Sequence, residues 1–174
     1  KISAPAKLLE SLGRKADHIL VGGGLANVFM AAEGLEIGES VVEKESQQLA
    51  WTIMKNFKDK LVMPTDFAVF DTSNPKETAI VKGRHEISGT EKICDIGPKT
   101  ILAYAKILKT AKTICWNGPV GYFEKKPFRA GTMALAKVVG SVSSGKAFGV
   151  AGGGETVAAI RQAHQFEYID HVST

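Results

Sequence analysis

The sequence of 174 residues has few cysteines and no long apolar run, and both absences exclude classes of protein. Two cysteines, Cys94 and Cys115, cannot form a disulfide scaffold, and neither has the CxxC or histidine spacing of a zinc site. The longest apolar runs are a few residues, so no transmembrane helix is expected. Residues 1–15 lack the apolar core of a secretory signal. We expect two reduced cysteines, packed as small hydrophobes, in a cytoplasmic protein.

The sequence also lacks any block of five like charges and any internal repeat. The formal net charge is only +4, and lysines are interleaved with acidic residues along the chain. This pattern does not indicate a nucleic-acid partner. Apolar residues make up 44% of the chain and charged residues 23%, which is typical of a globular fold and excludes disorder. The length predicts one domain over residues 1–174.

Short apolar runs alternate with longer helical patterns. Strands are expected at 18–21, 61–63, 67–70, 113–116, 147–151 and 168–172, and helices at 25–33, 40–58, 98–109, 128–143 and 155–164. The polar segment 73–88 is expected to be an excursion on the surface. Continuously apolar strands separated by helices predict a doubly wound α/β fold. We expect a three-layer α/β/α sandwich with a mainly parallel, Rossmann-like sheet, and ligands at the carboxyl ends of its strands.

Glycine triplets follow two of the expected strands, at 22–24 and 152–154, and each opens a helix. Glycine allows close backbone approach, and a helix N-terminus offers unpaired N–H groups, so the combination suits phosphate. The second triplet is the better candidate because Thr156 adds a hydroxyl and Glu155 can hold a metal ion. The alternative is a pair of tight turns that use glycine for close packing.

Two other glycine patterns match known motifs only in part. The segment 22–27 resembles GxGxxG but has Asn27 at the third position, and no acidic residue ends a strand about 20 residues later. The segment 140–147 resembles a P-loop, but Ala147 replaces the metal-binding hydroxyl and the segment lies between a helix and a following strand. We expect a helix-to-strand loop there. The histidines, which are expected to be structural or surface residues, are His18, His85, His164 and His171.

The segment Trp116–Glu124 resembles the WNGP-x-G-x-FE motif of phosphoglycerate kinases. Three further segments are similar to motifs of this family, in the expected order: Val21–Phe29, Asp95–Thr100 and Ala151–Thr156. The resemblance covers the C-terminal, nucleotide-binding half of the family. It implies a part in the reversible, Mg²⁺-dependent transfer of a phosphoryl group between 1,3-bisphosphoglycerate with ADP and 3-phosphoglycerate with ATP, a reaction of glycolysis.

The resemblance also implies roles for individual residues. The adenine slot would be lined by Gly22, Gly23, Val41, Gly97 and Val120, within a nucleotide site that includes Gly118 and Pro119. Glu124 would hydrogen-bond the ribose hydroxyls. The phosphates would be contacted by Lys1, Asn117, Gly153, Gly154 and Thr156, of which Lys1, Gly153 and Gly154 would act in catalysis. Glu155 would ligate Mg²⁺.

The sequence departs from the family pattern at two positions. The family usually has aspartate where Glu155 stands, and it has a second lysine where Pro5 stands. Loss of a cation near the transferring group can cost orders of magnitude in rate. We expect a monomeric part that binds ADP or ATP weakly and is inactive without the N-terminal domain, which would bind 3-phosphoglycerate. The alternative is a catalytically incompetent nucleotide-binding domain.

Overall fold

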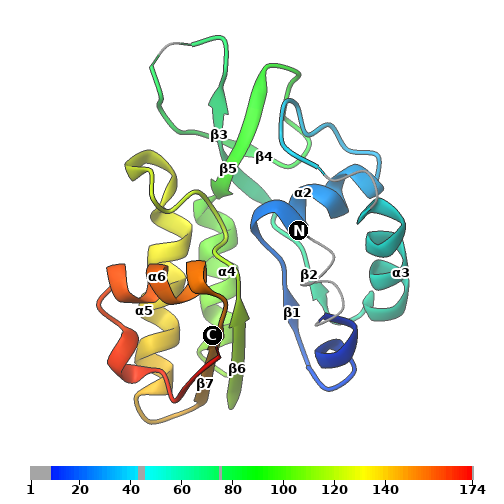
Figure 1. Cartoon of the computed structure of the whole chain (residues 1–174). Coiled ribbons are helices and arrows are strands. Elements are labelled where there is room, and N and C mark those ends of the chain that lie inside the picture. The colour runs from blue at the N-terminus through cyan, green and yellow to red at the C-terminus, as the bar shows by residue number, and fades with distance from the viewer. Residues whose placement is uncertain (1–8, 43–45, 75, 174) are drawn as a thin grey trace.

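Strands and helices alternate along most of the computed structural model, which describes residues 9–42, 46–74 and 76–173 (Figure 1). The strands are β1 (Ile19–Leu20), β2 (Leu61–Val62), β3 (Asp66–Asp71), β4 (Ile80–Gly83), β5 (Glu91–Ile96), β6 (Thr113–Asn117), β7 (Phe148–Gly152) and β8 (His171–Ser173). The α-helices that lie wholly within the described residues are α2 (Gly23–Ala32), α3 (Gln47–Phe57), α4 (Pro98–Leu108), α5 (Ala130–Ser143) and α6 (Gly154–Gln162). The 3₁₀ turns that also lie wholly within this part are η2 (Lys126–Phe128) and η3 (Phe166–Tyr168).

Parallel strands confirm the predicted α/β class. β1 pairs with β2 in parallel, and β6, β7 and β8 form a second parallel sheet in that order. Side chains connect the two sheets, because Leu20 and Val62 pack against a core cluster that includes Ile114 of β6. The buried Tyr104 hydroxyl of α4 lies 2.6 Å from the Val21 carbonyl oxygen and 2.9 Å from that of Val62. This contact fixes α4 beneath the end of the β1–β2 pair.

A third sheet, antiparallel and ordered β4-β3-β5, is absent from the sequence prediction. β5 was missed because Glu91 and Asp95 interrupt its apolar residues, yet both acidic residues are buried. β4 lies within the predicted surface excursion 73–88. It is an edge strand whose Ile80 and Val81 side chains are 40% and 56% exposed, so the excursion is on the surface but not irregular throughout.

Several predicted boundaries are wrong for identifiable reasons. The helix predicted over 40–58 starts only at Gln47, and residues 43–45 lie outside the described part. Instead, the Glu39 N–H donates to the Glu91 carbonyl (2.8 Å) and the Ile93 N–H donates to the Ser40 hydroxyl (2.8 Å), which ties this segment to β5. The helix predicted over 128–143 is η2 followed by α5. The strand predicted over 168–172 is replaced by the end of η3 and by β8.

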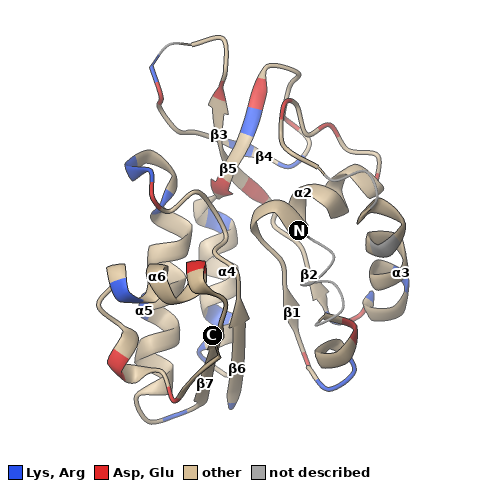
Figure 2. Ribbon diagram, viewed as in Figure 1, with Lys and Arg blue, Asp and Glu red and all other residues tan. Residues whose placement is uncertain are grey.

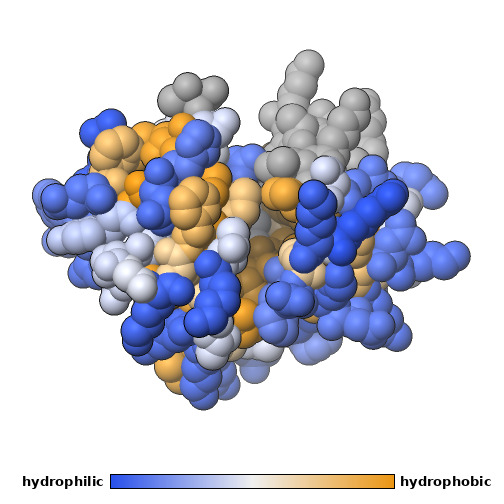
Figure 3. Space-filling model, turned by 90° about the horizontal axis from the view of Figure 1, so that it is seen from below, coloured by the Kyte–Doolittle hydropathy of each residue, from blue (hydrophilic) through white to orange (hydrophobic). Residues whose placement is uncertain are grey.

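Two apolar clusters form the core on opposite faces of β1, because Ile19 belongs to one cluster and Leu20 packs against the other. One contains Phe29, Ile53 and Phe67, and the other contains Tyr104 and Leu135. Seen from below, hydrophobic residues line the hollow between the two halves, and hydrophilic residues cover most of the rest of that face (Figure 3).

The two cysteines have different environments. Cys94 is buried, as predicted, whereas Cys115 is exposed, so the expectation that both pack as small hydrophobes is wrong for Cys115. Both are free thiols. Within the part of the chain that the structure describes, no helix combines the length and the apolar character needed to cross a bilayer.

Candidate functional site

The first glycine triplet packs directly against the loop that follows β6. The Gly23 N–H donates to the Val120 carbonyl at 3.2 Å. A Cβ atom on Gly22 would lie 2.5 Å from Cγ1 of Val120, and one on Gly23 would lie 2.8 Å from the Pro119 carbonyl oxygen. Gly23 also has a positive φ of +57°, which favours glycine. Close packing therefore requires glycine at both positions, as expected if this triplet is a tight turn that uses glycine for close packing.

The loop after β6 is also held by α6. The Gly118 N–H donates to the Thr156 hydroxyl at 2.7 Å, and the Trp116 indole N–H donates to the Gly118 carbonyl at 2.7 Å. Thr156 is fully buried. A Cβ atom on Gly153, whose φ is +86°, would lie 3.1 Å from Oδ1 of Asn117. The loops after β1, β6 and β7 thus form one continuous group at the carboxyl ends of three parallel strands.

The N-terminus of α6 is the exposed part of this group. The first helical bond of α6 runs from the Val157 N–H to the Gly153 carbonyl (3.1 Å), so the N–H groups of the preceding turn have no carbonyl within the helix. Gly153, Gly154 and Glu155 are exposed, and nothing lies within 4 Å of a Cβ placed on Gly154. The Gly153 N–H donates to the Ser173 carbonyl (3.3 Å), so the N–H groups of Gly154 and Glu155, together with the positive end of the helix dipole, are the donors that suit an anion.

Glu155 is the acidic residue in the first turn of α6, and its side chain is exposed. The described residues contain no group of three or more histidine, cysteine or acidic side chains that could hold a metal ion. Mg²⁺ is usually bound through one or two carboxylates together with phosphate oxygens rather than in an all-protein cage. One exposed carboxylate beside a helix start that suits an anion fits that mode of binding.

Asp66 supports the site from β3, and sequence reasoning gave it no role. Its carboxylate accepts the N–H groups of Lys99 (2.9 Å) and Thr100 (2.8 Å) and therefore caps α4, which has no cap of its own. A Cβ atom on Gly97 would collide with this carboxylate. No local pattern signals this contact, because the two partners are more than 30 positions apart in the chain.

Asp95 is the second buried acid near the site. Its Oδ1 accepts the Ile96 N–H at 2.9 Å, and its Oδ2 accepts the Gly131 N–H at 2.7 Å at the start of α5. Burial raises the pKa of Asp95 to about 7, against the lowering effect of these two hydrogen bonds. Cβ atoms on Gly121 and Gly131 would both collide with its carboxylate. Asp95 therefore joins β5 to α5 and to the loop after β6.

The structure brings together most of the predicted site residues that it describes. The contacts above join the residues Gly22, Gly23, Asn117, Gly118, Pro119, Val120, Gly153 and Thr156, and Gly154 and Glu155 are part of the same helix start. Val41 is 62% exposed and Glu124 is exposed, and neither forms a hydrogen bond or ion pair with this group among the described residues. The P-loop-like segment 140–147 is the end of α5 and the loop before β7.

Lys1 and Pro5 lie outside the described residues, so the structure gives no position for either. The roles implied for Lys1 as a phosphate contact and catalytic residue remain predictions.

Comparison with known proteins gives the same family along the whole chain. A sequence model described as phosphoglycerate kinase matches residues 1–174. The chain is 40% identical over 177 residues to the phosphoglycerate kinase of Chloroflexus aggregans and 41% identical over 174 residues to that of Deinococcus radiodurans. Both alignments cover 100% of this chain, and they cover 44% and 42% of the two relatives.

A solved structure of phosphoglycerate kinase from Coxiella burnetii has the same fold, with a TM-score of 0.91 and 38% identity, over 100% of this chain and 45% of the other. The chain therefore spans less than half the length of the relatives it matches. Because the sequence match and the shared fold both include every loop of the candidate site, the chain belongs to the phosphoglycerate kinase family.

Proposed function

We propose that this chain is the nucleotide-binding part of a phosphoglycerate kinase and that it binds ADP or ATP with the phosphates against the start of α6. The observation that carries the proposal is the exposed turn Gly153–Glu155 at the point where three strand-end loops meet, in which the N–H groups of Gly154 and Glu155 have no acceptor among the described residues. The adenine would lie against the surface formed by Gly22, Gly23, Val41, Gly97 and Val120, and Glu124 would bind the ribose.

The residues of the site would act by positioning and by charge stabilisation, without a covalent intermediate. Gly153 and Gly154 would lie against the terminal phosphates, with the Gly154 amide free to donate to them and Asn117 beside them. The Thr156 hydroxyl fixes the loop that carries Asn117, because it accepts the Gly118 N–H. Glu155 would hold Mg²⁺, which, when bound, offsets the negative charge of the phosphate oxygens.

The complete reaction would need more protein than this chain. We propose reversible phosphoryl transfer between 1,3-bisphosphoglycerate with ADP and 3-phosphoglycerate with ATP, in the cytoplasm and by a monomer. Another domain would bind the phosphoglycerate. The coverage of 42–45% of the relatives supports such a further domain.

Calorimetric titration with Mg-ADP tests the binding proposal, with Glu155→Gln and the conservative Glu155→Asp as a matched pair. We expect weak binding to the wild type, weaker binding to Glu155→Gln and retained binding to Glu155→Asp, because only the first variant loses the carboxylate. No heat at millimolar nucleotide would overturn the proposal. Full activity of the 174 residues in a coupled assay would overturn the need for another domain.

A nucleotide-binding domain without catalytic activity is the second candidate, and Pro5 favours it because the resemblance predicts a lysine there. Pro5→Lys in the intact protein distinguishes the two functions. A large gain in rate would support the second candidate, whereas an active parent protein with no gain would exclude it.

A further inference from the structure

A basic hollow lies on the edge of the molecule opposite the glycine loops. It has a volume of about 370 Å³ and is lined by Lys109, Lys137, Val138, Ser141, Val142 and Lys146. Lys109 ends α4, the next four residues belong to α5, and Lys146 lies in the loop between α5 and β7. This loop is at the bottom of the view in Figure 1, and Figure 2 shows basic positions along the same lower edge.

The three lysines of this hollow have no ion-pair partner among the residues that the structure describes. None of their ammonium groups forms an ion pair or donates a hydrogen bond within the residues that the structure describes, including to the carbonyl groups that end α4 and α5. No acidic residue lines the hollow. Three like charges around one concave surface repel one another and concentrate anions there. A multivalent anion would remove this repulsion.

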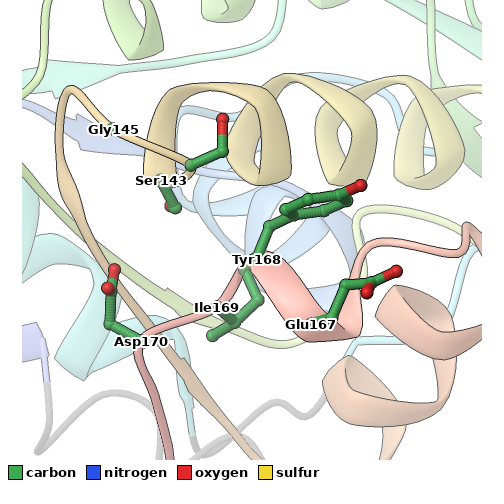
Figure 4. Close-up of a pocket in the computed structure, with 7 residues that line it drawn as sticks. Ser143, Gly145, Glu167, Tyr168, Ile169 and Asp170 are labelled. Atoms are coloured by element: carbon green, nitrogen blue, oxygen red, sulfur yellow. The ribbon is translucent and has the colours of Figure 1, made fainter.

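The hollow on the other side of the α5–β7 loop is lined by acidic side chains instead of basic ones. A second hollow of about 470 Å³ is lined there by residues that include Glu167, Tyr168 and Asp170. Figure 4 shows Glu167 and Asp170 at opposite ends of it. One Asp170 oxygen accepts the Gly149 N–H at 2.7 Å, which holds that carboxylate on this side of the loop. The two hollows on either side of the loop are therefore lined by side chains of opposite charge.

The chemistry of the basic hollow selects a class of ligand. Ammonium groups act as point charges and suit phosphate oxygens, and the Ser141 hydroxyl adds one donor. Val138 and Val142 supply the apolar surface. No aromatic or amide side chain lines the hollow, so it offers neither stacking nor hydrogen-bond recognition to a base. A small multivalent phosphate fits these groups better than a nucleotide.

The hollow is separate from the proposed nucleotide site. Lys146 precedes β7, whereas Gly153 follows it, and a strand of five residues is about 16 Å long. A ligand in the hollow and a nucleotide on α6 can therefore bind together. We propose that Lys109, Lys137 and Lys146 form a second anion site that binds pyrophosphate-like or bisphosphate anions.

The test is an NMR titration of the protein with inorganic pyrophosphate in magnesium-free buffer. We expect saturable shifts of the Lys109, Ser141 and Lys146 amides that are distinct from any shifts at Gly153–Thr156. Replacing the three lysines of the hollow with glutamine should weaken binding at this edge about tenfold or more and leave any response of α6 unchanged.

The matched control removes the same charge elsewhere, in the variant Lys15→Gln, Lys55→Gln and Lys58→Gln. All three control lysines are exposed and lie in the other half of the molecule. We expect affinity at the lower edge within about twofold of the wild type. An equal loss in both triple variants, or no shifts at the lower edge, would overturn the proposal.

Discussion

At the scale of single residues, Gly22 shows why a glycine in the site need not contact a ligand. Its φ of −152° is extended backbone that any residue adopts, so only the nearby Val120 side chain excludes a Cβ atom. Gly22→Ala should lower the free energy of unfolding by about 1–3 kcal/mol through overpacking. Chemical denaturation measures this change. Combining it with Val120→Ala should recover part of the loss.

The matched control for that variant is Gly154→Ala, because a Cβ atom there meets nothing within 4 Å. We expect a change within about 0.5 kcal/mol. Equal losses for Gly22→Ala and Gly154→Ala would show that the contact with Val120 does not explain the glycine.

Asp95 gives the protein a pH-dependent stability. Its ordinary pKa of 3.8 is raised by burial to about 7, so the native state binds the proton more tightly than the unfolded chain does. The stabilising contribution is complete below about pH 4 and is lost as the pH rises to about 7. The loss is at most about 4 kcal/mol.

The variant Asp95→Asn should lack this slope, since an amide does not titrate. Denaturant unfolding of both proteins between about pH 4 and pH 8 measures it. We expect the stability of the wild type to fall relative to the variant as the pH rises. Parallel pH profiles would contradict the raised pKa.

At the scale of elements, helix α4 depends on an N-terminal cap that a residue of strand β3 supplies. The Asp66 carboxylate accepts two backbone N–H groups and the Thr100 hydroxyl (2.6 Å). Asp66→Ala should cost about 2–3 kcal/mol of unfolding free energy and speed hydrogen exchange at the amides of Lys99 and Thr100.

Asp71 at the other end of β3 is the matched control. Its carboxylate accepts the Ser73 N–H and hydroxyl in an exposed turn, so Asp71→Ala should have a much smaller effect. If both variants lost the same stability, the cap would not be the reason for the importance of Asp66.

Local sequence patterns predicted some of these helices and strands but not others. Pro98 at the first turn and the period of the apolar residues predicted α4 to within one residue, because both signals are local. β5 could not be predicted from periodicity, because its buried acids are satisfied by partners elsewhere in the chain. For Asp95 these partners include Gly131 of α5. Likewise, the glycine triplets predicted the strand-end loops, but not that Gly22 and Gly23 pack on the Val120 loop.

At the scale of the whole molecule, the two edges of the parallel sheets differ in chemistry. The carboxyl-end edge has backbone N–H groups, glycines and the exposed carboxylates of Glu155 and Glu124. The opposite edge has Lys109, Lys137 and Lys146, which form no ion pair within the described part of the chain. The central claim is that the carboxyl-end edge binds the nucleotide, and it can be tested without catalytic activity.

The most direct measurement is an NMR titration of the protein with Mg-ADP, followed at backbone amides. We predict that the largest shifts occur at Gly22–Gly23, at Gly118 and Val120, and at Gly153–Thr156, which form one contact group at the carboxyl-end edge. The amides of Lys109 and Lys146 should change little. Shifts confined to the lower edge, or none at saturating nucleotide, would contradict the account.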